Sequence, residues 1–562
     1  MQLNGSQIVI ETLIEQGVDT IFGYPGGAIL NIYDELYKNS SRLRHVLTAH
    51  EQGASHAADG YARSTGKTGV VFATSGPGAT NLVTGIATAY MDSVPLIAIT
   101  CNVGTPLLGK DSFQEVDIAG VTMPITKHNF IVRDVNRLAD IIRQAFRIAN
   151  SGRPGPVLID IPKDITAAVA EFTPLSESEK KELFTKDNYN KFTSDDIKAA
   201  AELINSAQRP VIYCGGGVSI SGAEKELLEL AEKANIPVAV SLMGKTAIAS
   251  THPLCTGMIG MHGTKASNTA VSQSDLLIAI GARFSDRVIS NPKTFARNSK
   301  VLHIDIDPAE INKNIQTYAS VIGDVKAVLK ELNPLVNERK ATEWNEKVNE
   351  WKKNVPPMYT ALEDLHPKAI CEYVHSKIDG NEIVTTEVGQ HQMWIAQFYP
   401  FTTPRSFLTS GGLGTMGYGT GAAIGAQVGN PTKHVVHFAG DGSFRMNCNE
   451  LATIGHYQLP IIIIVLDNGV LGMVRQWQNL FYEKRFSQTT LDFGPDFVKL
   501  AEAYGISGIR VSKEADFKAA FDKALESGKP AIIDCAIPKD EMVLPMVPGG
   551  KSIDNLIMEV ES

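Results

Sequence analysis

The sequence predicts an α/β protein with three domains, each built on a doubly wound sheet of parallel strands. Short apolar runs recur along the chain, and most are followed by a glycine turn and a segment with helical periodicity. Two polar segments interrupt this alternation and leave three sections of similar size. Strands that alternate with helices form parallel sheets, because each helix returns the chain to the same end of the sheet. The expected divisions are a domain at 1–165, a linker at 166–195, a domain at 196–335, a linker at 336–365, a domain at 366–540 and a tail at 541–562.

In the first section, residues 6–16 have the pattern of a helix, and DTIFGYPGG that of a strand with a glycine turn. HVLTAH is a strand whose following helix begins near Glu51. VVFATSGPGATNLVTGIATAYMD repeats strand, turn and helix, PLIAITC adds a strand, and GRPGPVLIDIP closes the section. The pattern therefore predicts a complete parallel sheet before residue 166.

The second section has the strand candidates RPVIYCGGGV, IPVAVSLMGK, DLLIAIGARF and KVLHIDIDP, and it ends near Asp324. An exposed helix is expected around Trp344 to Trp351. The third section contains EIVTTEVG, SFLTSGGLGTMG, VVHF, PIIIIVL and PAIIDCAIP. The turn-rich end of the chain, MVLPMVPGGKSIDNLI, is expected to be mobile.

Composition argues against several functional classes. Apolar residues make up 43% of the 562, which suits a large core, and a net charge of −9 without a basic stripe argues against nucleic acid as a partner. The longest aliphatic run is far shorter than the ~20 residues of a membrane span. Six scattered cysteines without a CxxC motif, together with the absence of a signal-like N-terminus, predict a reducing, cytoplasmic location.

The stretch 440–470 carries the clearest chemistry. The strand VVHF leads to Gly440, Asp441 and Gly442, and the strand PIIIIVL ends at Asp467 and Asn468, with a helix expected at 449–457 between them. Adjacent parallel strands would place Asp441 close to Asn468, outside the carboxyl ends of the sheet. Their oxygens suit Mg²⁺, and glycines before a helix suit a phosphate. The pattern predicts a magnesium-bound diphosphate, whereas GDG alone would equally describe an ordinary turn.

This GDG-to-DN pattern resembles that of thiamine diphosphate enzymes. The resemblance implies that Asp441, Asn468 and the backbone carbonyl of Val470 hold Mg²⁺, although Asp467 stands where the family usually has Asn. It also implies contacts with the thiamine cofactor from the surrounding turns. These residues are Glu51, Ser75, Asn81, Gly389, Gln390, His391, Gly414, Met416, Gly440, Asp441, Gly442, Ser443, Asn468, Val470, Leu471, Gly472 and Met473.

Glu51 is the candidate catalytic acid. By itself it could simply stabilise a helix N-terminus, an effect of ~0.3–1 kcal/mol. The segment HEQGASHAADGYAR closely resembles the family pattern around the one carboxyl group that faces the aminopyrimidine ring, where an apolar pocket lets it share a proton.

The segment from Gly412 to Gly417, GLGTMG, matches the GxGxxG dinucleotide motif literally. The acidic residue expected ~20 positions later is missing, because that region is HVVHF. We therefore reject an NAD site here. The family resemblance instead places Met416 against the thiamine cofactor, although Met416 could also be an ordinary core residue.

The remaining motifs narrow the resemblance to the acetohydroxyacid (acetolactate) synthase family, over essentially the whole chain. They include YPGGAILNIYD, GKDSFQEVDIAGVTMPITKHNF, GMIGMHGT, GARFSDRV and LGMVRQWQNLFY. The resemblance implies a pyrimidine-binding, an FAD-binding and a diphosphate-binding domain, in chain order. The family's FAD positions match Arg153, Gly215, Gly216, Gly217, Met258, His262, Gly281, Arg283, Asp305 and Asp324.

The resemblance also assigns a substrate pocket. Phe113, Gln114 and Lys163 match catalytic positions, and Gly27, Ala28, Met473 and Trp477 match pocket positions. Trp477 is expected to favour 2-oxobutyrate over pyruvate as acceptor, because one methylene in contact with an indole is worth ~1–3 kcal/mol. The chain departs from the family at Gly104 (usually Pro), Ser285 (usually Asp) and Asn449 (usually Gln).

By resemblance, the chain decarboxylates pyruvate and transfers the hydroxyethyl unit to pyruvate or 2-oxobutyrate in branched-chain amino acid biosynthesis. FAD would have a structural role, because no step needs net redox chemistry. A homodimer or homotetramer with active sites between chains is implied, together with a small regulatory subunit. An FAD-type pyruvate oxidase or a decarboxylase on the same fold, and a non-enzymatic cofactor-binding protein, remain the alternatives.

Overall fold

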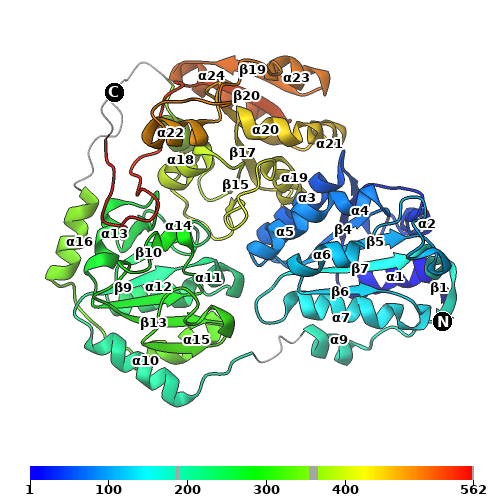
Figure 1. The fold of residues 1–562 in the computed structure, drawn as a ribbon, viewed down its shortest axis with the longest axis horizontal. Coiled ribbons are helices and arrows are strands. Elements are labelled where there is room, and N and C mark those ends of the chain that lie inside the picture. The colour runs from blue at the N-terminus through cyan, green and yellow to red at the C-terminus, as the bar shows by residue number, and fades with distance from the viewer. Residues whose placement is uncertain (185–188, 354–364, 560–562) are drawn as a thin grey trace.

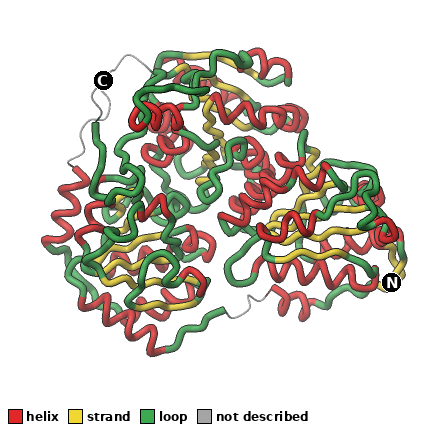
Figure 2. Tube along the Cα trace, in the orientation of Figure 1, coloured by secondary structure: helices red, strands yellow, loops and turns green. Residues whose placement is uncertain are grey.

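The computed structural model describes residues 1–184, 189–353 and 365–559. It contains three α/β domains, each with a six-stranded sheet in which every strand pairing is parallel. Figure 2 shows the strands of each domain between layers of helices. The predicted fold class is therefore confirmed.

The N-terminal domain is blue to cyan in Figure 1, and its sheet has the order β3-β2-β4-β5-β7-β6. Its strands are β2 (Thr20–Gly23), β3 (Arg44–Leu47), β4 (Gly69–Ala73), β5 (Leu96–Asn102), β6 (His128–Ile131) and β7 (Pro156–Pro162). Its helices are α1 (Gly5–Glu15), α2 (Leu30–Lys38), α3 (Glu51–Thr65), α4 (Pro77–Asn81), α5 (Val83–Met91), α6 (Ile118–Thr122), α7 (Leu138–Asn150) and α8 (Lys163–Ala167).

The middle domain, green in Figure 1, has the order β11-β10-β9-β12-β13-β14. Its strands are β9 (Pro210–Cys214), β10 (Val238–Val240), β11 (Cys255–Met258), β12 (Leu276–Ile280), β13 (Lys300–Asp305) and β14 (Ala319–Ile322). Its helices are α10 (Ser194–Ser206), α11 (Gly216–Ser221), α12 (Glu224–Lys233), α13 (Lys265–Gln273), α14 (Asp286–Ile289) and α15 (Val325–Leu332).

The C-terminal domain, yellow to red, has the order β16-β15-β17-β18-β20-β19. Its strands are β15 (Glu382–Thr386), β16 (Phe407–Leu408), β17 (His434–Gly440), β18 (Ile461–Asp467), β19 (Ser507–Val511) and β20 (Ala531–Ala536). Its helices are α17 (Pro367–Ile378), α18 (Gln390–Phe398), α19 (Gly419–Gly429), α20 (Asp441–Asn447), α21 (Leu451–Tyr457), α22 (Gly472–Phe481), α23 (Phe497–Ala503) and α24 (Glu514–Ser527).

The three sheets have two strand orders. Numbered within each domain, the N- and C-terminal sheets both read 2-1-3-4-6-5, while the middle sheet reads 3-2-1-4-5-6, the order typical of dinucleotide-binding folds. In such sheets a ligand crevice forms where the order reverses, outside the strands' carboxyl ends. That point lies between β2 and β4, between β9 and β12, and between β15 and β17.

The N- and C-terminal domains are joined by α3 and α19, which lie side by side (Figure 1). Glycines line this contact: a Cβ on Gly425 would overlap the carbonyl oxygen of Ala57, and one on Gly60 would overlap that of Ala422. Only glycine lets the two backbones approach this closely, as small residues do at other tight helix pairs.

The two segments expected to be linkers carry structure of their own. The first contains β8 (Val169–Glu171), which pairs antiparallel with β1 (Gln2–Asn4), and α9 (Glu177–Phe184). The second contains α16 (Glu343–Lys353). Residues 185–188 and 354–364 of these segments lie outside the described residues.

Two expectations, one about the second linker and one about the C-terminal tail, were wrong. The helix around Trp344 is present, but Trp344 is only 5% exposed, and its indole N–H donates to the carbonyl of Pro210 at 3.1 Å. The tail was expected to be mobile, but its described part is packed against the protein: four of its apolar side chains are fully buried, namely Val543, Met546, Val547 and Ile553. The N–H of Val547 bonds to Met261, so the tail runs over the middle domain. Both packing partners are distant in sequence.

No helix within the described ranges is long and apolar enough to cross a membrane.

We expect Trp344→Ala to lower the free energy of unfolding of the middle domain by ~3–5 kcal/mol, because it leaves a large cavity and an unpaired carbonyl. Lys347→Ala, on the exposed face of the same helix, is the control and should change it by less than ~0.5 kcal/mol. Urea unfolding followed by far-UV circular dichroism measures both. Equal midpoints for the two variants would contradict the burial of Trp344.

Candidate functional site

Strand β17 borders the switch point of the C-terminal sheet, and β18 is its neighbour on the side away from β15. Gly440 of β17 is in register with Leu466 of β18, so Asp441 and Asn468 follow neighbouring strand ends, as the sequence predicted. The intervening chain differs from the expected single helix at 449–457. Asp441 is itself the first residue of α20, and α21 begins only at Leu451.

The carboxylate of Asp441 is 6% exposed. Burial, reinforced by the neighbouring carboxylate of Asp467, raises the pKa of Asp441 to about 7. Asp467 and Asp534 share Arg510, at 2.9 and 2.5 Å. A buried carboxylate beside a second one is stabilised by a cation, so this strand end fits a divalent ion.

The Asn468 side chain is oriented by its neighbours. Its amide nitrogen donates to Oε1 of Gln390, and its oxygen accepts the N–H of Val470, both at 3.2 Å, which leaves a second lone pair on that oxygen. Gln390 also donates to Gln476 and to the carbonyl of Glu541, so its amide ties α18 to α22 and the tail.

His391 adds a polar atom at the same switch point. Its ring is 4% exposed, burial lowers its pKa to about 3, and its Nε2 has no hydrogen-bond partner among the described residues. A Cβ on Gly440 or on Gly389 would lie within 3.0 Å of this ring. The glycines therefore make room for a neutral, unsatisfied imidazole. Two other predicted cofactor contacts are glycines: Gly442 packs on Leu471, and Gly472 packs on Gln390. The hydroxyl of Ser443, a third, donates to the carbonyl of Gly440.

Glu51 begins α3 in the N-terminal domain and is 8% exposed. Its Oε2 accepts a hydrogen bond from the Asn81 amide at 2.9 Å. Ser75, which follows β4 and precedes Asn81 by six residues, is also buried. Asn81 therefore fixes the orientation of the Glu51 carboxyl, a role that the sequence pattern alone did not specify.

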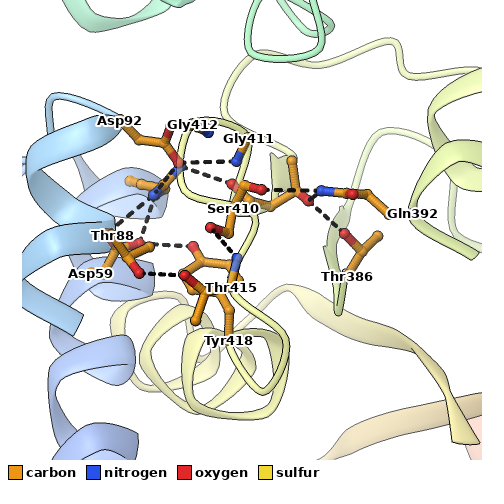
Figure 3. A network of polar contacts seen from close by, with 12 residues as sticks. Asp59, Thr88, Asp92, Thr386, Gln392, Ser410, Gly411, Gly412, Thr415 and Tyr418 are labelled. Carbon is orange, nitrogen blue, oxygen red and sulfur yellow. Dashed lines mark hydrogen bonds and ion pairs between the residues drawn. The ribbon is translucent and has the colours of Figure 1, made fainter. Parts of the chain in front are cut away.

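The loop 409–418, which contains Gly414 and Met416, is held by a buried polar network (Figure 3). Asp92 accepts the N–H groups of Gly411 and Gly412, and Thr88 bonds to Thr415. From the C-terminal side, Glu387 accepts the N–H of Gly417 at 2.6 Å. These anchoring residues were not among the sequence candidates.

Glu387 is fully buried at the end of β15. Burial raises its pKa to about 7, although hydrogen bonds from the N–H groups of Thr420, Gly417 and Gly419 act in the opposite direction. The carboxyl therefore joins the Met416 loop to the first turn of α19. A charged residue directly after the predicted strand EIVTT was the only sequence signal for it.

A cavity of about 1460 Å³ opens on the switch point of the middle sheet. Its lining includes all ten residues that the sequence assigned to FAD, namely Arg153, Gly215, Gly216, Gly217, Met258, His262, Gly281, Arg283, Asp305 and Asp324. Met473 and Trp477 line it as well. His262 is 7% exposed, burial lowers its pKa to about 4, and its Nδ1 has no partner in the described structure.

Close backbone packing shapes this crevice. A Cβ on Gly217 would lie 2.7 Å from the Cα of Gly281, so the turns after β9 and β12 touch directly. Some candidates already have protein partners: Arg153 pairs with Glu310 at 2.9 Å, and Asp324 accepts from Ser221 at 2.9 Å. The crevice combines a buried polar atom that has no partner, Nδ1 of His262, with glycine turns after β9 and β12. These features suit a phosphate-containing ligand.

The substrate candidates lie on two separate surfaces. Phe113 is 87% exposed, and Gln114, Lys163 and Gly27 are exposed as well, while Ala28 is half-buried. All belong to the N-terminal domain, whereas Trp477 lies on α22, on another side of the chain in Figure 1. A single chain does not bring these residues into one pocket of the described structure.

One group of metal-type side chains lies elsewhere among the described residues. One ligand atom from each of His375, Asp379 and Glu382 lies within 4.8 Å of the others. Nε2 of His375 is 3.7 Å from Asp379, and Nδ1 is 3.9 Å from Glu382. Because different ring nitrogens face the two carboxylates, the imidazole lies between them and does not share one ion with both.

Comparison with known proteins gives full-length matches. Family models of thiamine pyrophosphate enzymes match as the N-terminal TPP binding domain at 3–121, the central domain at 197–332 and the C-terminal TPP binding domain at 387–535. The chain is 48% identical to a probable acetolactate synthase large subunit of Methanococcus aeolicus, over 100% of this chain and 96% of that protein. It is 45% identical to the acetolactate synthase isozyme 2 large subunit of Escherichia coli, over 99% of each.

We expect Glu387 to make stability depend on pH. Because its pKa is raised when folded, the folded chain binds more protons between its ordinary value of 4.5 and about 7, so this contribution is complete below 4.5 and is lost as pH rises through 7. The difference in unfolding free energy between the protein and Glu387→Gln should therefore change by ~2–3 kcal/mol between pH 5 and 8. The exposed Glu171→Gln is the control. Parallel pH profiles for the protein and Glu387→Gln would contradict this.

Proposed function

This chain belongs to the acetolactate synthase large subunits, a family of thiamine diphosphate enzymes, and we propose that it joins two 2-oxo acids. It decarboxylates pyruvate and transfers the hydroxyethyl unit to a second pyruvate, giving 2-acetolactate, or to 2-oxobutyrate, giving 2-aceto-2-hydroxybutyrate. These products serve branched-chain amino acid biosynthesis. The observation that carries the proposal is the full-length similarity at 45–49% identity.

Asp441, Asn468 and the carbonyl of Val470 would hold Mg²⁺ at the carboxyl ends of β17 and β18. The buried carboxylate of Asp441, beside Asp467, and the free lone pair of Asn468 support this. His391 offers its unsatisfied Nε2 to a polar group of the cofactor. When bound, thiamine diphosphate supplies the nucleophilic carbon and the electron sink for decarboxylation.

Glu51 would exchange a proton with the aminopyrimidine ring of the cofactor. Its carboxyl is nearly buried, and Asn81 holds it in one orientation, which favours a directed proton transfer. Ser75, Gly414 and Met416 would contact the same ring system from two loops.

FAD would occupy the cavity of the middle domain. The 3-2-1-4-5-6 strand order, the glycine-lined switch point and the unsatisfied Nδ1 of His262 support a dinucleotide there. Arg283 lines this cavity and can pair with a pyrophosphate. The overall reaction transfers no net electrons, so FAD would serve the structure of the site.

The active unit would be at least a homodimer, with the tetramer as a further assembly. Phe113, Gln114 and Lys163 are exposed on one domain, while Trp477 lies on another, and a second copy would bring such surfaces together. A small regulatory subunit fits the "large subunit" in the names of the relatives. All six cysteines are free, which fits a reducing cytoplasm.

A product assay tests the function. The purified chain is incubated with pyruvate, Mg²⁺, thiamine diphosphate and FAD, and 2-acetolactate is expected. Adding 2-oxobutyrate should divert the product to 2-aceto-2-hydroxybutyrate. Acetate, acetyl phosphate or acetaldehyde without acetolactate would instead identify the oxidase or decarboxylase alternative.

We expect Glu51→Gln to lower kcat by at least ~100-fold without loss of folding, because the amide cannot exchange the proton. Glu35→Gln, which changes a buried glutamate on α2 of the same domain, is the matched control and should keep kcat within about twofold. Initial rates and far-UV circular dichroism measure both properties. Turnover near that of the unmodified protein would remove Glu51 from its assigned role.

A further inference from the structure

We propose that Asp92 is a positioning residue, whose carboxylate in the N-terminal domain fixes the backbone of the loop 409–418 and thereby the place of Met416. The inference rests on the proposed function, because it takes Met416 as a contact of the thiamine cofactor. It concerns a residue at the end of α5 that was not among the sequence candidates and that also borders the cavity of the middle domain.

The contact of Asp92 with the loop is bidentate. Oδ1 accepts the N–H of Gly412 at 2.7 Å, and Oδ2 accepts the N–H of Gly411 at 3.1 Å. A Cβ on Gly412 would lie 2.7 Å from Oδ1 of Asp92, so a side chain there would push the carboxylate away. The literal GxGxxG pattern therefore makes room for a carboxylate of the protein at its first glycine.

The charge of Asp92, whose side chain is 0% exposed, is balanced by Arg63 on α3. Nη2 of Arg63 lies 3.0 Å from Oδ2 of Asp92, and Nη1 donates to the carbonyl of Thr409 at 3.0 Å. Nε of Arg63 bonds to Asp59 at 2.6 Å. The start of the loop is thus fixed by charge-assisted hydrogen bonds in a water-poor site, where such bonds are strongest.

The far end of the loop is fixed separately. Thr415 bonds to Thr88 at 2.7 Å, and the Tyr418 hydroxyl donates to Asp59 at 2.7 Å (Figure 3). Between the two anchors, Leu413 and Gly414 are exposed, and Met416, next to Thr415 of the far anchor, is only half-buried. Core packing therefore does not set the path of this segment, and the anchors at its ends do.

The anchors from the N-terminal domain come from α3, from α5 and from Asp92 directly after it, while Glu387, Gln392 and Asn447 hold the loop from the C-terminal domain. α3 also presents Glu51 at its first residue. If these anchors only stabilised the contact between the two domains, their loss would lower stability alone. A positioning role predicts a change in cofactor binding and turnover beyond that loss.

The test is Asp92→Asn in the full chain. The amide keeps the shape but offers only one acceptor to the two N–H groups and no charge to Arg63. We expect kcat to fall about tenfold and the Kd for thiamine diphosphate, measured with Mg²⁺ by tryptophan fluorescence, to rise about tenfold, with the KM for pyruvate within about twofold. Thr88→Val, at the second anchor, should act in the same direction and keeps the test open if Asp92→Asn fails to fold.

Tyr61→Phe is the matched control. Tyr61 lies on α3 two residues before Arg63 and donates a partly buried hydrogen bond to Asp19 at 2.6 Å, with no hydrogen bond to the loop. It should lower the unfolding midpoint without moving the Kd or kcat by more than about twofold.

A double-mutant cycle with Met416→Ala completes the test. If Asp92 acts through Met416, adding Asp92→Asn to Met416→Ala should change the Kd by less than about twofold. Additive effects, or an Asp92→Asn protein that binds and turns over normally, would overturn the proposal. The Kd does not depend on the product, so an unmodified protein that binds the cofactor but makes no acetolactate would refute the proposed function alone.

Discussion

The close packing of α3 against α19 is the constraint on which the rest of the structure depends. Gly60 and Gly425 let the two helices approach until backbone meets backbone, and the buried charges of Asp59, Arg63 and Asp92 lie at the end of that contact. Both helices follow the second strand of sheets with the same 2-1-3-4-6-5 order. The contact therefore joins equivalent parts of two domains, and α3 carries both Glu51 and two residues that hold the Met416 loop, Asp59 and Arg63.

Strand order then determines where chemistry can occur. In each sheet the two strands at the reversal point are parallel, but the connections that follow them lead in opposite directions along the sheet, so a crevice forms there without special residues. The C-terminal sheet fills it with Asp441 and His391, and the middle sheet with glycines and His262. The proposed cation site and the proposed dinucleotide crevice differ in which side chains follow the strands, since both lie at the carboxyl ends of parallel strands.

Local patterns made much of this predictable. The alternation of strands and helices, and the strand ends at Asp441 and Asn468, depend on neighbours in sequence. The ten FAD candidates were known by resemblance, and all of them line one cavity. What the sequence missed depends on distant partners. Trp344 is buried because Pro210 offers a carbonyl, and Asp92 matters because the loop 409–418 folds onto it from more than 300 residues away. The pattern of polar residues along α16, or at the end of α5, does not predict these partners.

The glycines of the chain show how far a motif can be interpreted on its own. Gly217 and Gly281 bring two strand-end turns into contact, Gly440 makes room for His391, and Gly412 accommodates the carboxylate of Asp92. All four positions require a close approach, and the sequence correctly marks each as special. The approaching group is a backbone, an imidazole or a carboxylate, and only the fold identifies which. The GxGxxG spacing at 412–417 was rejected as an NAD site for want of an acidic residue downstream, and Asp92, an acidic residue far upstream, is the partner it has instead.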